Sequence, residues 1–272
     1  MSYTTIKLTE EELAVFYETS SLPLVREPVE NEYFMIYCND ELVDKICYQH
    51  GKFRPLKFKN INSFHLGKLY PRNPEQELAF DMLQDDSTCI KILAGQYGSG
   101  KSLLIFAHAL QALEREKIEK IVFVRNNIEL KDTTPLGALP GSLNDKTIEW
   151  AANLGDHLGG MEGVRYMVDK NQLEIIPLGY MRGRDLKHCI IFVDEAENLT
   201  THQCQLLIGR IGEGSQLWLA GDRRQTDKAV FDKDSGMQKM IDRLTGKPLF
   251  QYVYLSKSER SEASAYADYL DD

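Results

Sequence analysis

The fold is decided by one glycine-rich run, Gly95-Gln96-Tyr97-Gly98-Ser99-Gly100-Lys101-Ser102. This run fits the pattern G-x-x-x-x-G-K-[ST] without a mismatch. Its glycines let the backbone curl so that successive N–H groups face one anion. A helix that begins near Lys101 would direct its positive dipole end at the same anion. The sequence therefore predicts a phosphate-binding loop.

The flanking residues support this interpretation. An apolar run at 90–94 precedes the loop, and residues 103–113 have the composition of a helix that continues from it. We expect Lys101 to reach the β and γ phosphates of a nucleotide and the Ser102 hydroxyl to bind Mg²⁺. The alternative is an ordinary glycine-rich turn between a strand and a helix. The residues expected to bind the nucleotide are Gly95, Gln96, Tyr97, Gly98, Ser99, Gly100, Lys101, Ser102 and Leu103.

A second apolar run, at 190–193, ends in two acids, Asp194 and Glu195. Carboxylates at the end of a buried strand are costly unless they have a task there. Asp194 is suited to hold Mg²⁺, and Glu195 is suited to polarise an attacking water as a general base. Acids also cap strands that lead into helices, which is the structural alternative.

A third apolar run, at 216–220, leads into Gly221-Asp222-Arg223-Arg224-Gln225. One class of ATPases has an extra strand between the phosphate-loop strand and the acidic strand. In that class a polar sensor at this position meets the γ-phosphate, and Gln225 is the candidate here. The alternative is a polar loop in which Asp222 and Arg223 simply face water.

The order of patterns predicts an α/β protein. From Pro71 onward, apolar runs alternate with amphipathic stretches, which implies a mostly parallel sheet covered by helices. Upstream, Thr9 and Glu12 form a capping box for a helix from Glu10 to about Ser20. Runs at 33–37 and 52–58 suggest a small β-rich domain. We expect an accessory domain over 1–70, an ATPase domain over 71–272, and core strands near 88–94, 121–125, 173–177, 189–194, 216–220 and 252–255.

Composition limits the possible partners. The chain has 272 residues and a formal net charge of −9, which argues against a protein that coats nucleic acid over its whole surface. A local basic path along Lys52, Arg54, Lys57 and Lys59 remains open, and so does a strand with one solvated face. The five cysteines show no zinc or redox spacing. No signal pattern or membrane-length apolar run is present, so we expect a cytoplasmic protein.

Taken together, these segments resemble the PhoH-like ATPases, a family related in its nucleotide site to superfamily 1 helicases. The resemblance runs from about Asn31 to Leu270 and looks closest to the ATPase half of PhoH proteins that carry a PIN nuclease. About 30 residues precede it, so ribonuclease activity is not carried over. It implies a RecA-like P-loop core of the ASCE type that uses ATP and Mg²⁺. Further matching segments are Pro71-Arg72-Asn73-Pro74-Glu75-Gln76, Val124-Arg125, Leu136-Gly137-Ala138-Leu139-Pro140-Gly141, Tyr180-Met181-Arg182-Gly183-Arg184, Asp194-Glu195-Ala196-Glu197-Asn198 and Ser258-Glu259-Arg260.

The resemblance implies roles for several further residues. Gln76 matches a glutamine that reads adenine, although it also suits a helix-capping position. Arg260 matches a late arginine that acts as a finger on the γ-phosphate, within the chain or across a subunit boundary. A surface salt bridge with Glu259 or Glu262 is the alternative for Arg260. For Arg182 and Arg184, the sequence does not separate contact with an RNA backbone from contact with a neighbouring subunit's nucleotide.

Two residues depart from the family pattern. Glu197 replaces the glutamine of the related DEAQ motif, which couples nucleotide state to movement, and Asn126 replaces a usual proline. The departures leave hydrolysis intact and make coupling to a nucleic-acid strand less secure.

The resulting hypothesis is Mg²⁺-dependent hydrolysis of ATP to ADP and phosphate. The resemblance implies that hydrolysis is coupled to RNA or single-stranded DNA in a helicase-like manner, and that the chain forms a homo-oligomeric ring, a hexamer. The alternative is a nucleotide-controlled assembly module that acts on protein partners, which the acidic charge and Glu197 favour. A third hypothesis is a small-molecule kinase. It is less favoured, because the acidic strand and the sensor loop follow the arrangement found in ATPases.

Overall fold

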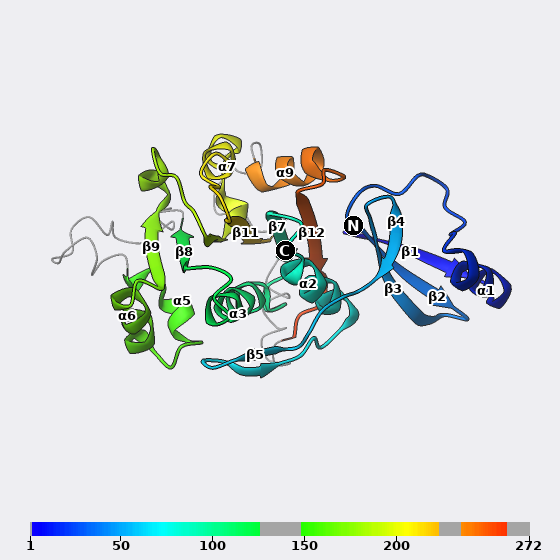
Figure 1. The fold of residues 1–272 in the computed structure, drawn as a ribbon, viewed down its shortest axis with the longest axis horizontal. Coiled ribbons are helices and arrows are strands. Elements are labelled where there is room, and N and C mark those ends of the chain that lie inside the picture. The colour runs from blue at the N-terminus through cyan, green and yellow to red at the C-terminus, as the bar shows by residue number, and fades with distance from the viewer. Residues whose placement is uncertain (1, 126–147, 223–234, 260–272) are drawn as a thin grey trace, which may run out of the picture.

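The computed structural model describes residues 2–125, 148–222 and 235–259. Its centre is a six-stranded, all-parallel sheet in the order β12-β7-β11-β10-β8-β9 (Figure 1). All six predicted core strands are present, at most two residues off at either end: β7 (Ile90–Gly95), β8 (Lys120–Arg125), β9 (Leu173–Pro177), β10 (Cys189–Asp194), β11 (Gln216–Gly221) and β12 (Phe250–Leu255).

The order of these strands positions the site. β11 lies between β7, which leads into the phosphate loop, and β10, which carries the acids. This is the extra strand that the sequence predicted. Because all the strands are parallel, their carboxyl ends meet at one edge of the sheet, where polar loops gather. β10 is buried along its whole length, which explains its uninterrupted apolar run.

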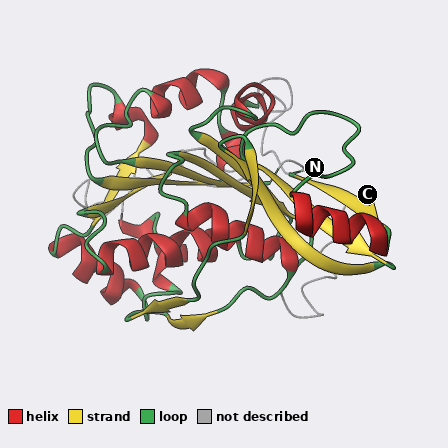
Figure 2. Cartoon of the chain, turned by 45° about the vertical axis from the view of Figure 1, so that its right-hand side comes forward, coloured by secondary structure: helices red, strands yellow, loops and turns green. Residues whose placement is uncertain are grey.

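Helices cover both faces of this sheet (Figure 2). One face packs against α2 (Pro74–Gln84), α3 (Lys101–Glu114), α5 (Ala152–Gly155) and α6 (Met161–Asp169). The other face packs against α7 (Thr201–Ile208), α9 (Gly236–Leu244) and the short 3-10 turns η2 (Leu178–Met181) and η3 (Ala196–Asn198). In the described ranges, no helix is both long and apolar enough to cross a bilayer.

The N-terminal part forms a smaller mixed sheet in the order β1-β2-β3-β4. Its strands are β1 (Tyr3–Leu8), β2 (Glu32–Cys38), β3 (Glu41–Gln49) and β4 (Lys52–Pro55), with α1 (Glu10–Thr19) beside them. A two-stranded hairpin of β5 (Ile61–Ser63) and β6 (Gly67–Leu69) follows. The predicted helix and its capping box between Thr9 and Glu12 are confirmed. The run at 52–58 is a strand only as far as Pro55, and β1, β3, β5 and β6 were not predicted.

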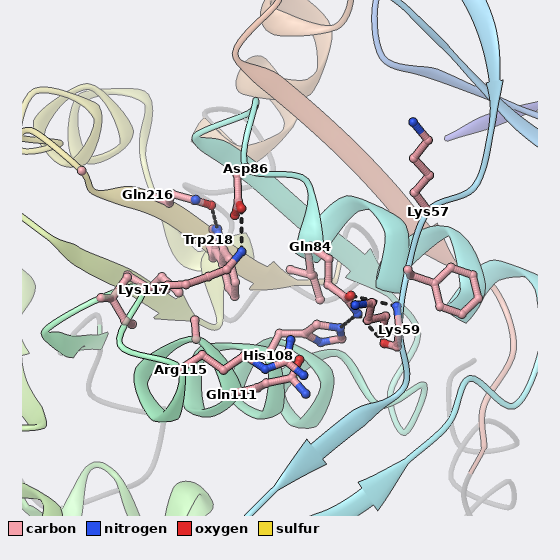
Figure 3. Close-up of a pocket in the computed structure, with 16 residues that line it drawn as sticks. Lys57, Lys59, Gln84, Asp86, His108, Gln111, Arg115, Lys117, Gln216 and Trp218 are labelled. Carbon is pink, nitrogen blue, oxygen red and sulfur yellow. Dashed lines mark hydrogen bonds and ion pairs between the residues drawn. The ribbon is translucent and has the colours of Figure 1, made fainter.

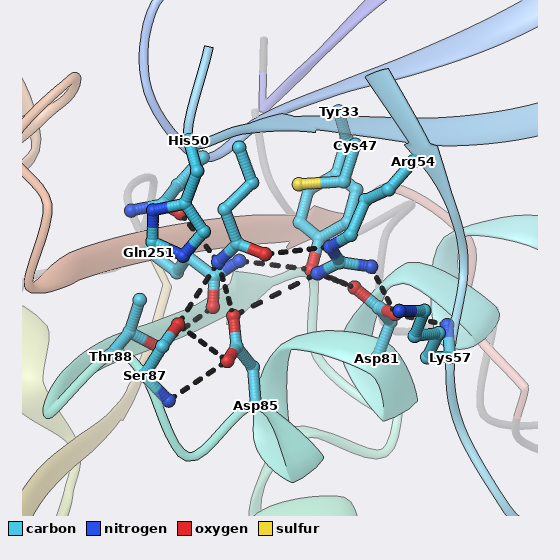
Figure 4. A network of polar contacts seen from close by, with 12 residues as sticks. Tyr33, Cys47, His50, Arg54, Lys57, Asp81, Asp85, Ser87, Thr88 and Gln251 are labelled. Atoms are coloured by element: carbon cyan, nitrogen blue, oxygen red, sulfur yellow. Dashed lines mark hydrogen bonds and ion pairs between the residues drawn. The ribbon is translucent and has the colours of Figure 1, made fainter. Parts of the chain in front are cut away.

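A buried polar network fastens the small sheet to the large core (Figure 4). The two terminal guanidinium nitrogens of Arg54 donate to the carboxylate of Asp81 on α2, at 2.9 and 3.0 Å. The Tyr33 hydroxyl donates to the same carboxylate at 2.8 Å and accepts from the Gln251 amide of β12 at 3.3 Å. Arg54 is therefore neither on a solvated strand face nor on an open basic path. The division into domains at residue 70 stays a prediction.

Candidate functional site

The phosphate loop connects β7 to α3 as the sequence predicted. Gly98 and Gly100 have φ values of +75° and +90°, in the left-handed region that favours glycine. Gly95 is required for a different reason, since a Cβ there would lie 2.5 Å from the Leu255 carbonyl oxygen of β12. Glycine therefore allows both the curl of the loop and the close approach of the neighbouring strand.

Lys101 folds back across this loop. Its Nζ donates to the Gly95 and Gln96 carbonyl oxygens at 2.7 and 2.8 Å. The Ser99 hydroxyl, on a buried side chain, donates to the same Gln96 oxygen at 2.8 Å. These contacts hold the ammonium group at the rim of the curled backbone, where a phosphate chain is expected to sit.

The acidic strand meets the phosphate loop directly. The Ser102 hydroxyl donates to Asp194 Oδ1 at 2.8 Å. Ser102 lies at the start of α3, after β7, and Asp194 is the last residue of β10, so the contact spans β11, which lies between those two strands. Asn153 Nδ2 on α5 donates to the other carboxylate oxygen at 2.6 Å. Ser102 and Asp194 were both predicted to bind Mg²⁺, whereas no motif marks Asn153.

This group of oxygens fits a magnesium ion. Hydroxyl and carboxylate oxygens are its preferred ligands, and it commonly takes few of them from protein because nucleotide phosphates and water supply the rest. Asn153 Oδ1 is buried and has no hydrogen-bond partner within the described ranges, so it can accept from a metal-bound water. The same ranges hold no cluster of three or more His, Cys, Asp or Glu that would bind a metal alone.

Glu195 is held by Arg125, the last residue of β8. Arg125 Nη2 lies 2.6 Å from Glu195 Oε1, and its Nη1 donates to the Trp150 carbonyl oxygen at 2.9 Å. Glu195 itself has a φ of +55°, which is uncommon and strained for a residue with a side chain. The ion pair and the strained backbone together fix where this carboxylate points.

A pocket of about 430 Å³ opens beside the loop. Gln76 lines it, with Nε2 donating to the Ser99 carbonyl oxygen at 3.2 Å and Oε1 accepting from Arg72 N at 2.9 Å. The helix cap itself is Asn73, which accepts from Gln76 N. Gln76 thus stabilises the phosphate loop through this hydrogen bond. Its role in recognising adenine stays a prediction. Lining residues beyond the predicted set include Tyr70, Arg72, Asn153, His157 and Glu259.

Comparison with known proteins now identifies the family. The family model described as "PhoH-like protein" matches residues 68–267. The chain belongs to the PhoH-like family. It is 35% identical over 198 residues to "Protein PhoH2" of Thermobispora bispora, covering 71% of this chain and 45% of that protein. It is 32% identical over 209 residues to "Protein PhoH2" of Bacillus subtilis, covering 72% and 46%.

This PhoH-like chain spans about half the length of the curated relatives that it matches. Among solved structures, the Pif1 helicase from Candida albicans aligns with a TM-score of 0.38 and 15% identity, covering 75% of this chain and 44% of that one. No residue role is transferred from an alignment at that level.

Glu197 in this PhoH-like chain is buried behind the two acids. Its Oε2 accepts from Asp222 N at 3.0 Å. Burial, reinforced by the nearby charges of Asp194 and Glu195, raises the pKa of Glu197 to about 8. At neutral pH the group is therefore mostly an uncharged acid, which can both donate and accept, as a glutamine amide does. An uncharged Glu197 is therefore chemically similar to the glutamine that the DEAQ motif led us to expect here.

Asp222 is buried, so the reading in which it faces water is wrong. Arg184 pairs with Glu174 at 2.7 Å, and Arg182 is exposed. Four predicted features lie outside the described residues: Asn126, the segment 136–141, Gln225 and Arg260. Glu259, next to Arg260, donates its N–H to the Gly98 carbonyl oxygen at 3.1 Å and so adjoins the phosphate loop.

Proposed function

We propose that this PhoH-like protein hydrolyses ATP to ADP and phosphate in a magnesium-dependent reaction. The observation that carries the proposal is the 2.8 Å contact between Ser102 Oγ and Asp194 Oδ1. That contact brings the loop suited to a triphosphate beside the carboxylate suited to its metal. Two features of the sequence, far apart in the chain, thereby become one site.

Each residue has a distinct task in the proposed reaction. Lys101 and the loop N–H groups bind the β and γ phosphates. Magnesium, held by Ser102 and Asp194, neutralises charge on the phosphate oxygens when it is bound. Glu195 accepts a proton from the attacking water, whose oxygen bonds to the γ-phosphorus as the bond to the bridging oxygen breaks. The electron pair of the broken bond stays on the bridging oxygen, which leaves as part of ADP.

We further propose that turnover is coupled to RNA or single-stranded DNA in a homo-oligomeric ring. The family resemblance implies a hexamer, in which Arg260 of one subunit would complete the site of the next. The uncharged state of Glu197 supports coupling, because a neutral hydrogen-bonding group sits where related proteins use glutamine. The assembly-module alternative predicts turnover that is indifferent to either nucleic acid.

The test is the release of phosphate from ATP by the whole chain. Lys101→Ala should abolish turnover, because the phosphates lose their principal cation. Lys68→Ala, an exposed lysine on β6, is the matched control and should turn over ATP normally. Retained turnover in Lys101→Ala would refute the site. Stimulation of wild-type turnover by RNA or single-stranded DNA supports coupling to nucleic acid over the assembly-module alternative.

Sharing of the site between subunits is tested by mixing two inactive variants. Arg260→Ala removes the proposed finger and Glu195→Gln removes the proposed base. If the finger acts across the boundary, mixed rings contain some sites with both groups intact and regain turnover. Mixtures with no more activity than the sum of the two variants contradict a finger in trans.

A further inference from the structure

A second pocket lies at the edge of the sheet opposite the phosphate loop (Figure 3). Its volume is about 790 Å³, within the range that holds a small organic ligand. The walls come from the segment after β4, the ends of α2 and α3, and the starts of β10 and β11. None of the residues assigned to ATP hydrolysis lines it.

The rim of this pocket is cationic in a chain that is acidic overall. Lys59, Arg115 and Lys117 line it, whereas Figure 3 shows the Lys57 side chain extending away from the others. Lys117 pairs with Asp86 at 2.6 Å. Across the described ranges, no carboxylate lies within ion-pair distance of Lys59 or Arg115. Two uncompensated cations at one pocket, against a net charge of −9, favour an anionic ligand.

His108, inside the pocket, contributes no charge to it. His108 Nδ1 lies 2.7 Å from the Leu104 carbonyl oxygen, and its Nε2 lies 3.2 Å from the Gln84 amide nitrogen. This arrangement suits the neutral ring, since one nitrogen donates and the other accepts. Burial lowers the pKa of His108 to about 4, in agreement with that assignment.

The other walls combine amides with apolar surface. Gln111 and Gln216 line the pocket together with Leu83, Ile118 and Trp218. Glutamine amides can hydrogen-bond the edge of a nucleobase, and apolar side chains suit its uncharged ring. Gln216 Oε1 accepts from Trp218 Nε1 at 2.9 Å, so this amide would meet a ligand through its nitrogen (Figure 3). A phosphate on the cationic rim with a heterocycle against these walls would contact both parts of the pocket, whereas inorganic phosphate would contact the rim alone.

We propose that this pocket is a second binding site, for one nucleotide unit, with its phosphate on Lys59 and Arg115. The unit belongs either to a free nucleotide or to a single strand of nucleic acid, and only the second source rests on the proposed function. The site is separate from the phosphate loop: α3 has 14 residues and spans about 21 Å between them. A ligand at Arg115 would thus contact the far end of the helix that begins at Lys101.

The test measures binding in the full chain carrying Lys101→Ala, so that the phosphate loop no longer competes for the probe. AMP binding is followed by equilibrium dialysis, and binding of a fluorescein-labelled oligouridylate by anisotropy. Lys59→Ala with Arg115→Ala should weaken binding at least tenfold, because each cation neutralises phosphate charge. Lys68→Ala with Arg165→Ala, which removes one lysine and one arginine elsewhere on the surface, should leave binding unchanged.

The variants are chosen to preserve the fold. Gln84 bonds the backbone N and O of Lys59, at 2.9 and 2.7 Å, and not its side chain. Lys59→Gln with Arg115→Gln, which keeps most of the side-chain volume, provides a second version that should lose binding equally. Thermal unfolding checks each variant.

The outcomes separate cleanly. If AMP binds and the pocket variants lose that binding, the ligand is a free nucleotide. If AMP does not bind, and oligouridylate binds and is lost in the pocket variants, the ligand is a nucleic-acid strand. Absence of any binding in Lys101→Ala, or binding that the pocket and control variants affect equally, overturns the proposal. Because no arm measures turnover, a failure of the proposed hydrolysis leaves this test intact.

Discussion

At the scale of single residues, the position of the proposed base depends on Arg125. Its guanidinium lies 2.6 Å from Glu195 and is anchored to the Trp150 carbonyl oxygen, so it orients a carboxylate that has a strained backbone. Arg125→Ala should lower kcat about tenfold or more with little change in KM, because misplacement of the base slows chemistry and leaves the phosphate contacts intact.

Steady-state ATP turnover checks this prediction. Arg165→Ala, on the exposed face of α6, is the control. A rise in KM at constant kcat would show that Arg125 binds substrate and does not position Glu195. Arg125→Lys should recover only part of kcat, because an ammonium cannot make both contacts of the planar guanidinium.

Glu197 makes a prediction about pH. Its pKa is about 8 in the folded protein and about 4.3 in an unfolded chain, so folding binds a proton between those values. The free energy of unfolding should therefore fall as pH rises through this window. Glu197→Gln removes that contribution while keeping the neutral hydrogen-bonding group. The variant should lose less stability than the wild type between about pH 6 and about pH 8.5.

Urea unfolding at the two pH values measures the difference. Glu162→Gln changes an exposed glutamate and should follow the wild type. Equal losses in all three proteins would mean that Glu197 is ionised throughout, and the comparison with the family glutamine would fail.

At the scale of elements, the junction of β7 and β12 depends on Gly95. An added Cβ would lie 2.5 Å from the Leu255 carbonyl oxygen and 2.8 Å from its Cβ. Gly95→Ala should lower the free energy of unfolding by about 1 to 3 kcal/mol, because neither strand can move without disturbing the sheet. Gly179→Ala is the control, since nothing lies within 4 Å of its added Cβ. Equal stability of the two variants in urea would contradict the contact.

The elements also show what a sequence can predict. Strands buried on both faces read as apolar runs, which is why β10 was predicted with correct bounds. β3 was missed because Glu41, Asp44 and Lys45 break any such run. The phosphate loop could be predicted from sequence because its backbone conformation requires glycine at fixed spacing. Asn153 and Arg125 contact the acids from elsewhere in the chain. Arg125 belongs to a segment that matches the family, but no local pattern encodes either contact.

At the scale of the whole molecule, the small sheet and the core are joined by the pair of Arg54 and Asp81. The side chains are 15% and 1% exposed. Arg54→Ala should cost about 3 kcal/mol of unfolding free energy, because it leaves a buried carboxylate without its cationic partner. Lys7→Ala breaks the exposed pair with Asp40 and should have no measurable effect.

Chemical unfolding followed by far-UV circular dichroism measures both variants. Equal stability of Arg54→Ala and Lys7→Ala would mean that the network does not join the two sheets energetically. A biphasic transition in the wild type would support the domain division at residue 70.

The central claim, that the phosphate loop and the acidic strand form one ATP-hydrolysing site, is tested most directly by Glu195→Gln. The measurement is the rate of phosphate release from ATP and magnesium, with ATP affinity measured in parallel. The account predicts a rate roughly 10² to 10⁴ times lower with ATP affinity retained, because the variant keeps the phosphate contacts and loses the base. A variant that releases phosphate at the wild-type rate would contradict it.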